Sequence, residues 1–270
     1  AKGRKTSVKR MLSILASLML AAAASAVELE EAPEGLTGRE LAERAEDTLY
    51  SATTYLAAEM TVVSPRLSSD RVVAFENWDD RPGKRSFIRI TQPIKDADTT
   101  FLKLHPNLWM HVPRVERTMR IPPSMMLQSW MGSDFTNDDL VRESSALDDY
   151  DHVLLGIDPA PEGHPGRRAY VVEYRPHEDA PVVWGKIVMW IDVERSTPLR
   201  QEFFDEDGEK LRLMEFADIS LVDGRHYPRR WRMRPLDKQG HETRIEVREV
   251  RFDVDIDEQT FTKRALTRTR

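Results

Sequence analysis

From Tyr55 onward, apolar residues recur with a period of two, and this alternation limits the fold of the chain more than any other feature. Pairs of residues typical of hairpin turns separate several segments: Asp207-Gly208, Asp223-Gly224 and Gln239-Gly240. Strands joined by short turns pair antiparallel. The expected strands are 55–64, 70–78, 85–92, 99–105, 108–113, 116–121, 151–157, 167–175, 183–193, 198–205, 209–221, 227–235 and 241–253.

So many strands cannot form a flat open sheet, because twist accumulates from strand to strand. The pattern therefore predicts a mainly β (α+β) fold in which about 11–12 antiparallel strands curl into a barrel or half-barrel. One helix precedes the strands. A capping-box pattern begins at Thr37, and Leu41, Ala45 and Leu49 then recur at helical spacing. We expect a helix from Thr37 to about Ser51, lying on the sheet through its single apolar stripe.

Residues 1–26 have the pattern of a secretory signal peptide. A basic head is followed by the apolar run Leu12–Ala24 and by the small-residue cleavage pattern Ala24-Ser25-Ala26. The alternative is a buried N-terminal helix, but such a helix would carry polar residues on one face. We expect 27–36 to be a flexible mature N-terminus and 37–270 to be one domain.

Cleavage there would remove five basic residues, so the mature chain would be five units more negative than the formal charge of −6. A domain this acidic is a poor partner for nucleic acid or an anionic membrane surface. The chain has no cysteine, so it has no disulfides and no site for a lipid anchor at the cleavage position. We expect a free, soluble protein in a bacterial periplasm; secretion is the alternative.

The sequence shows none of the common catalytic or metal-binding patterns. The histidines are scattered, and the acidic run 253–257 fails as a calcium loop, because Glu258 and Arg264 replace the required glycine and glutamate. Ser133 lies outside a G-x-S-x-G motif, and no obvious base accompanies it. We therefore expect no enzyme, no metal and no cofactor; a lipid-modifying enzyme is the less favoured alternative.

Tryptophan and methionine concentrate in residues 108–140, after the pair Pro122-Pro123 in particular. These side chains form either ordinary core beneath a long loop or a mobile, adaptable lid over an apolar cavity. Strand 183–193 is apolar on both faces, so helices or a ligand must cover the second face. The candidate cavity and lid residues are Trp109, Met119, Met125, Met126, Trp130, Met131, Trp184, Met189 and Trp190.

A positive run interrupts this acidic chain at Arg114, Arg117 and Arg120, with Lys103 nearby in sequence. It is either the solvated face of a strand or a surface that docks a partner or contacts an anionic head group.

Several motifs together resemble a LolA-like family of outer-membrane lipoprotein-sorting proteins. The central ones are Leu108–Pro113, Arg117–Ile121, Trp130–Phe135 and Asp138–Leu140. Further matches are Trp190-Ile191-Asp192, Pro198-Leu199-Arg200, 204–208, Gly224 with Tyr227-Pro228, and Phe261-Thr262. The resemblance covers roughly residues 40–266, and its most distinctive element is Gly132-Ser133-Asp134-Phe135.

The resemblance implies an open half-barrel whose concave face is covered by helices. It implies a periplasmic carrier that shields lipidic or acylated cargo between the inner and outer membranes, with transient membrane contact and no covalent chemistry. The cargo is either a lipoprotein or another lipid. Members of this branch are often associated with inner-membrane exporters of the resistance-nodulation-division (RND) type. The alternative role is an adaptor or sensor of such an exporter that carries no cargo.

Overall fold

The computed structural model describes residues 28–142 and 146–268. The expected signal peptide therefore lies outside the described residues. Within these ranges, no helix is both long and apolar enough to span a bilayer.

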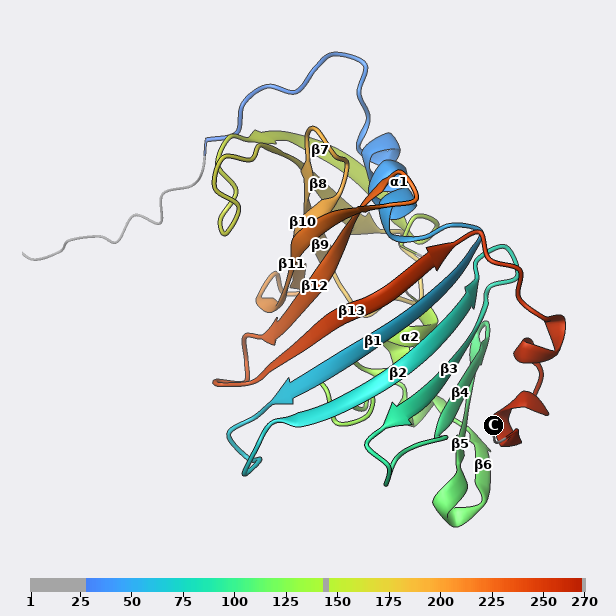
Figure 1. Cartoon of the computed structure of the whole chain (residues 1–270). Coiled ribbons are helices and arrows are strands. Elements are labelled where there is room, and N and C mark those ends of the chain that lie inside the picture. Colours follow the sequence, from blue (N-terminus) through green and yellow to red (C-terminus); the bar gives the residue numbers. More distant parts are fainter. Residues whose placement is uncertain (1–27, 143–145, 269–270) are drawn as a thin grey trace, which may run out of the picture.

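Thirteen strands form a single antiparallel sheet that curves into an open half-barrel (Figure 1). The strands are β1 (Thr53–Val63), β2 (Arg71–Asp80), β3 (Arg85–Gln92), β4 (Thr100–Leu104), β5 (Asn107–Val112), β6 (Arg117–Arg120), β7 (Tyr150–Asp158), β8 (Ala169–Pro176), β9 (Lys186–Asp192), β10 (Pro198–Phe204), β11 (Lys210–Val222), β12 (Arg225–Pro235) and β13 (Glu242–Phe252). The mainly β half-barrel is confirmed. The expected segments each coincide with a strand to within a few residues, although the sheet has more strands than the 11–12 expected.

The strand order is β6-β5-β4-β3-β2-β1-β13-β12-β11-β10-β9-β8-β7, so β1 and β13 meet near the middle of the sheet. Two sub-sheets result: the β1–β6 half, which includes β13, and the β7–β12 half. They are joined by a short ladder in which Arg230–Met233 of β12 pair with 243–246 of β13. By contrast, β13 pairs with β1 along nearly its whole length. In Figure 1, β12 and β13 diverge beyond this short ladder.

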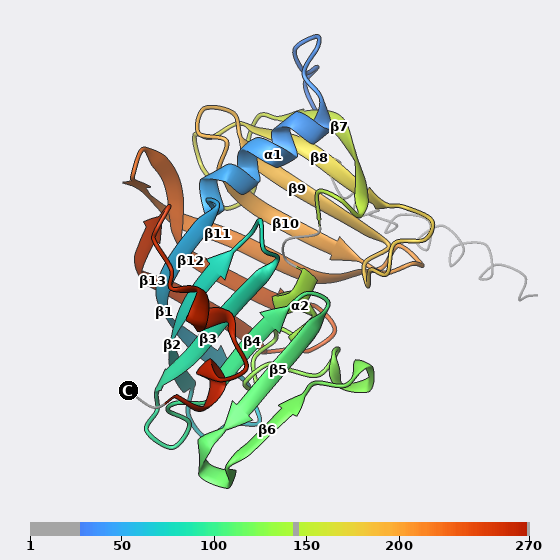
Figure 2. The ribbon, with the colours of Figure 1, turned by 90° about the vertical axis from the view of Figure 1, so that its right-hand side faces the viewer.

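Helix α1 (Gly38–Leu49) lies across the concave face of the β7–β12 half (Figure 2). It begins as expected, since the Thr37 side chain accepts a hydrogen bond from the Glu40 amide at 3.2 Å. Leu41 and Ala45 are buried against Tyr174 and other residues of that half. Gly38 has to be glycine, because a Cβ there would lie 2.6 Å from the backbone oxygen of His152.

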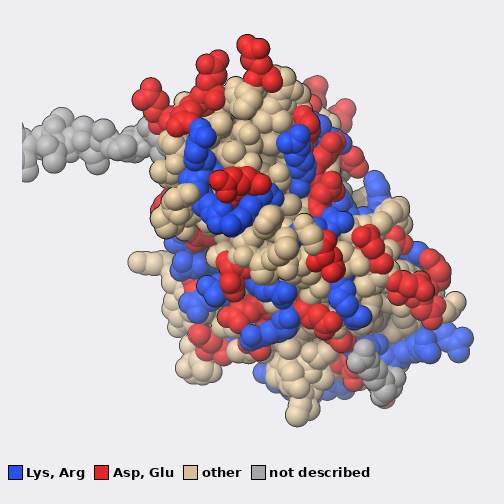
Figure 3. All heavy atoms as spheres, turned by 45° about the horizontal axis from the view of Figure 1, so that its top comes forward, with Lys and Arg blue, Asp and Glu red and all other residues tan. Residues whose placement is uncertain are grey.

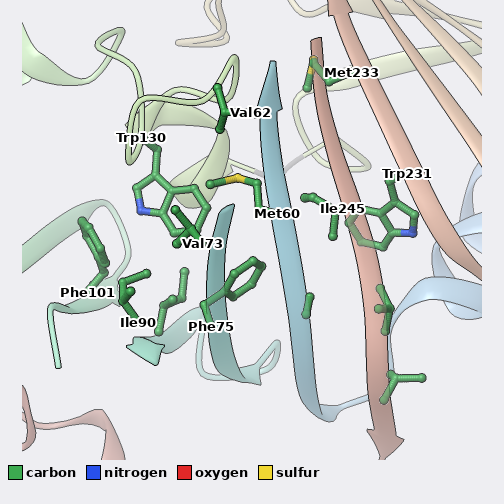
Figure 4. Close-up of a cluster of buried hydrophobic side chains, with 14 of the residues drawn as sticks. Met60, Val62, Val73, Phe75, Ile90, Phe101, Trp130, Trp231, Met233 and Ile245 are labelled. Atoms are coloured by element: carbon green, nitrogen blue, oxygen red, sulfur yellow. The ribbon is translucent and has the colours of Figure 1, made fainter. Parts of the chain in front are cut away.

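The concave face of the β1–β6 half is covered by residues 122–142, which we call the lid segment. It contains the 3₁₀ turn η2 (Pro123–Met125) and the short helix α2 (Asn137–Arg142). Trp130 of this segment makes edge-to-face contacts with Phe75 and Phe101, with ring centroids 5.5 and 5.8 Å apart (Figure 4). Helical elements therefore cover the concave face of both halves, as expected.

The convex face of β3 and β4 is covered by the C-terminal 3₁₀ turns η4 (Glu258–Phe261) and η5 (Ala265–Thr267). Phe261 and Leu266 pack there against Phe87 and Leu102 in a separate apolar cluster. Nothing in the sequence pattern predicted this outer layer. A remaining 3₁₀ turn, η1 (Pro113–Val115), lies between β5 and β6.

Candidate functional site

A cavity of about 270 Å³ lies between α1, the lid segment and the concave faces of both halves. From the β1–β6 half it is lined by Leu56, Phe75 and Ile88. From the β7–β12 half it is lined by apolar and aromatic side chains, Tyr150, Tyr174, Trp184, Ile187, Met189, Phe203, Met214, Phe216, Tyr227, Trp231 and Met233. The strand alternation produces this lining, because every second residue of a strand faces the same side.

The Gly-Ser-Asp-Phe element fastens the lid segment to the sheet. Met131 and Gly132 both have positive φ, 52° and 80°, which reverses the chain after Trp130. The Ser133 hydroxyl donates to the Trp130 carbonyl at 2.7 Å, and Ser133 is only 5% exposed. The backbone N–H of Asp134 donates to Thr243 Oγ1 at 2.9 Å, and that hydroxyl donates to Asp134 Oδ2 at 2.8 Å. These hydrogen bonds give Ser133 and Asp134 a structural role.

Arg212 links the lid segment to the wall of the cavity. Its guanidinium donates to both carboxylate oxygens of Asp139, at 2.9 and 3.1 Å. It also stacks over the rings of Trp184 and Phe203, 4.8 and 5.7 Å from their centroids. Arg212 is 8% exposed, so this charge is held in the interior by its pairing.

Besides Arg212, Asp139 and Gln201, the mostly apolar wall of the cavity has a polar corner. Asn77 and Asp79 of β2 and Ser86 of β3 line it. Asp79 lies 3.7 Å from the ammonium group of Lys103, which is 4% exposed. Burial raises the pKa of Asp79, and the charge of Lys103 opposes that rise. Lys103 is therefore an interior residue and does not belong to the exposed positive run at Arg114 that the sequence suggested.

The structure brings three of the expected cavity residues, Trp130, Trp184 and Met189, to the cavity wall. Four methionines, Met119, Met125, Met126 and Met131, pack instead against the cluster around Trp130. All four are therefore neighbours of the lid core.

Trp109 and Trp190 do not line the cavity, because the strand registers turn them to the opposite face. Trp109 packs in the outer cluster, with Lys263 Nζ 3.8 Å from its ring centroid. Trp190 Nε1 donates to Asp158 Oδ2 at 2.9 Å, and the Arg200 guanidinium lies over its ring. The concave positions of these two strands belong to their sequence neighbours, as Met189 shows.

Sequence reasoning missed much of the wall, including Tyr174, Phe216 and Tyr227. Trp231 and Met233 fall within the expected strand 227–235 but were not among the candidate residues. These residues are cross-strand neighbours of other concave residues, so they can be identified only when the pairing register of the strands is known.

The positive run at Arg114, Arg117 and Arg120 lies at η1 and on β6, the edge strand of the β1–β6 half. All three side chains are exposed, and Arg120 donates to Asn107 Oδ1 at 3.1 Å. On the face shown in Figure 3, acidic and basic side chains are interspersed.

Comparisons with known proteins match this fold. A family model, described as "Uncharacterized protein"-like, matches residues 83–268. No curated protein matches the sequence of the chain.

Three solved structures are similar over most of their length. A DUF1329 family protein from Desulfovibrio piger is 23% identical with a TM-score of 0.75, covering 85% of this chain and 97% of its own. An outer membrane lipoprotein-sorting protein domain from Vibrio parahaemolyticus, described as putative, is 24% identical with a TM-score of 0.71, covering 86% and 98%. A LolA superfamily protein from Nitrosomonas europaea is 19% identical with a TM-score of 0.70, covering 85% and 99%. At these identities, the likeness establishes the fold.

Proposed function

We propose a function for this chain, which belongs to the family whose model matches residues 83–268 and has the fold of the LolA superfamily. The protein binds lipidic or acylated cargo in its apolar cavity. It carries this cargo through the periplasm between the inner and outer membranes. The similar structure from Vibrio parahaemolyticus, which is described as an outer membrane lipoprotein-sorting domain, supports this role.

The observation that carries the proposal is an apolar hollow in the interior of a charged protein. The chain is 32% charged, yet the cavity wall is dominated by aromatic and aliphatic side chains. Its volume of about 270 Å³ is slightly below the range of small-molecule sites, which are about 300–1,000 Å³. Each methylene group buried there would contribute about 0.8 kcal/mol, so part of an acyl chain is enough for binding.

Release requires the cavity to open, and the lid segment is the element that can do this locally. It contacts the sheet through Trp130, through Asp134 with Thr243, and through Asp139 with Arg212. None of these contacts belongs to the sheet ladder. The lid segment can therefore detach while the strands remain paired.

No covalent chemistry is proposed. The Ser133 hydroxyl donates to the Trp130 carbonyl and accepts from the Phe135 amide within a buried turn, so its hydrogen bonds serve the structure of that turn. The Asp134 carboxylate accepts from Thr243.

Three turns of the β1–β6 half carry exposed apolar side chains, which suits them for transient contact with a membrane. Leu67 is 42% exposed, Ile94 is 86% exposed and Val115 is 64% exposed. Exposed cations adjoin them in sequence: Arg66, Lys95 and Arg114. Because strand directions alternate, these three turns all lie at the same ends of their strands, the lower ends in Figure 1. The apolar side chains of these turns would enter the headgroup layer of the membrane, and the neighbouring cations would pair with lipid phosphates, so the carrier would bind the membrane briefly.

The test is to purify the full chain from the periplasm without detergent, record native mass spectra and extract lipids. A bound lipid or acylated peptide is the expected result. A clean protein mass, combined with failure to bind a fluorescent fatty probe, would refute the carrier and leave the exporter-adaptor role.

A cavity-filling variant sharpens this test. Gln201 lines the cavity, so Gln201→Trp should abolish cargo and probe binding. Gln259→Trp is the matched control, since Gln259 is exposed on η4, and it should bind like the wild type.

A further inference from the structure

The polar corner of the cavity is built from a row of cross-strand neighbours on the concave face. Asp79 of β2 pairs with Thr54 of β1 and with Ser86 of β3, and Ser86 in turn pairs with Lys103 of β4. Thr54, Ser86 and Lys103 are each at most 6% exposed. The row lies where these strands end beside the β2–β3 turn, at one end of the cavity.

Asn77 lies one step further into the cavity and is surrounded by apolar residues. Its cross-strand neighbours are Leu56 and Ile88, and all three line the cavity. The Asn77 side-chain oxygen is buried and has no hydrogen-bond partner among the described residues. A buried amide oxygen without a partner costs free energy, and a leucine would pack better between these neighbours. Folding alone therefore gives no reason for an asparagine here.

The polar corner adjoins a second, polar hollow on the surface of the protein. The two hollows share Tyr50 and Leu147. The outer hollow is also lined by charged side chains, Asp47, Arg81, Lys84, Asp148 and Arg225. An amphiphile with its chain in the apolar cavity and its polar end at Asn77 and Asp79 would thus place any larger head group toward a polar surface.

We propose that the polar corner binds a hydrogen-bond donor on the cargo, with Asn77 Oδ1 and the Asp79 carboxylate as the acceptors. This inference rests on the proposed carrier function and narrows its cargo. The cavity takes an amphiphile whose chain ends in a hydroxyl, amide or ammonium group. A deprotonated fatty acid is disfavoured, because its carboxylate has no hydrogen-bond donor to offer Asn77 Oδ1. A plain hydrocarbon leaves Asn77 Oδ1 without a hydrogen-bond donor.

The experiment compares two probes that differ only in the donor: a long-chain alcohol and its methyl ether of the same chain length. Their affinities for the full chain are measured by displacement of a fluorescent fatty probe. The wild type should bind the alcohol at least about tenfold more tightly, which corresponds to about 1.4 kcal/mol. Asn77→Leu should reduce this preference to less than about threefold while ether binding is kept.

The matched control is Asn107→Leu, at the start of β5 outside the cavity, which should keep the full preference. Melting temperatures of both variants verify that they fold. Equal binding of the two probes to the wild type, or an unchanged preference in Asn77→Leu, overturns the inference and leaves the carrier function standing. Failure of the wild type to bind either probe overturns the carrier function and the inference together.

Discussion

Replacing Thr243 by valine should release the lid segment without changing the cavity wall. Thr243 is fully buried, and its hydroxyl is engaged in two hydrogen bonds with Asp134. Valine keeps the shape of the side chain but removes both bonds. The bond to the carboxylate contributes about 1.5–3 kcal/mol and the one from the backbone N–H about 0.5–1.5 kcal/mol, so the lid should lose about 2–4.5 kcal/mol.

Amide hydrogen exchange measures this loss at named positions. Suitable reporters are the amides of Trp130, Ser133, Asn137 and Asp138, which are among those that donate to a carbonyl within the lid segment. A loss of about 2–4.5 kcal/mol corresponds to roughly 30- to 2,000-fold faster exchange at these amides. Amides in the centre of β8 and β9 should change far less, because their ladder does not depend on the lid.

Thr100→Val is the matched control. Thr100 is 1% exposed, and its hydroxyl donates to the Leu266 carbonyl at 2.8 Å, which fastens the C-terminal turns to the convex face. This variant should accelerate exchange around η5 and leave the lid amides protected. If Thr243→Val left the lid amides unchanged, or accelerated the whole chain uniformly, the lid would not be an independent unit and the reasoning would be refuted.

Three other outcomes are expected. Trp130→Ala should lower the free energy of unfolding by about 3–5 kcal/mol in urea denaturation, because a 3% exposed ring is lost; a change below about 1 kcal/mol would contradict its place in the core. Burial lowers the pKa of His152 and His164 below the ordinary 6.5, so the unfolded state binds more protons than the folded state. The melting temperature should therefore fall as pH drops below 6.5, and a melting temperature that does not change with pH would contradict the burial of these two imidazoles. Ile94→Asp should weaken the flotation of the protein with phospholipid vesicles. Leu221→Asp, at an exposed leucine near the opposite ends of the strands, should not weaken it, and equal loss in both variants would refute membrane contact through the three turns.

The sequence predicted the sheet well because its signals are local. Turn residues such as Gly208 and Gly224 adopt the positive φ that their hairpins require, and alternation between turns marks each strand. Thr37 likewise predicted the start of α1.

The cavity could not be predicted to the same depth, because it is assembled from residues distant in sequence. Which side of a strand faces inward depends on register, and a slip of one position exchanges Met189 for Trp190. The burial of Lys103 depends on its pairing with Asp79, two strands away in the sheet. Composition left the role of the lid segment open. The cluster of Trp and Met fitted either core beneath a long loop or a mobile lid, and only the contacts show that Trp130 belongs to the core and that specific hydrogen bonds fasten the segment.

The short ladder between β12 and β13 has a mechanical consequence. The backbone pairs between β12 and β13 run from Arg230 with Glu246 to Met233 with Thr243, and Trp231 and Ile245 at this same place line the cavity. Bending there changes the distance between opposite walls and leaves the longer ladders on either side intact. The short ladder is therefore the place where the sheet can bend most easily, and the angle between its two halves sets the width of the cavity.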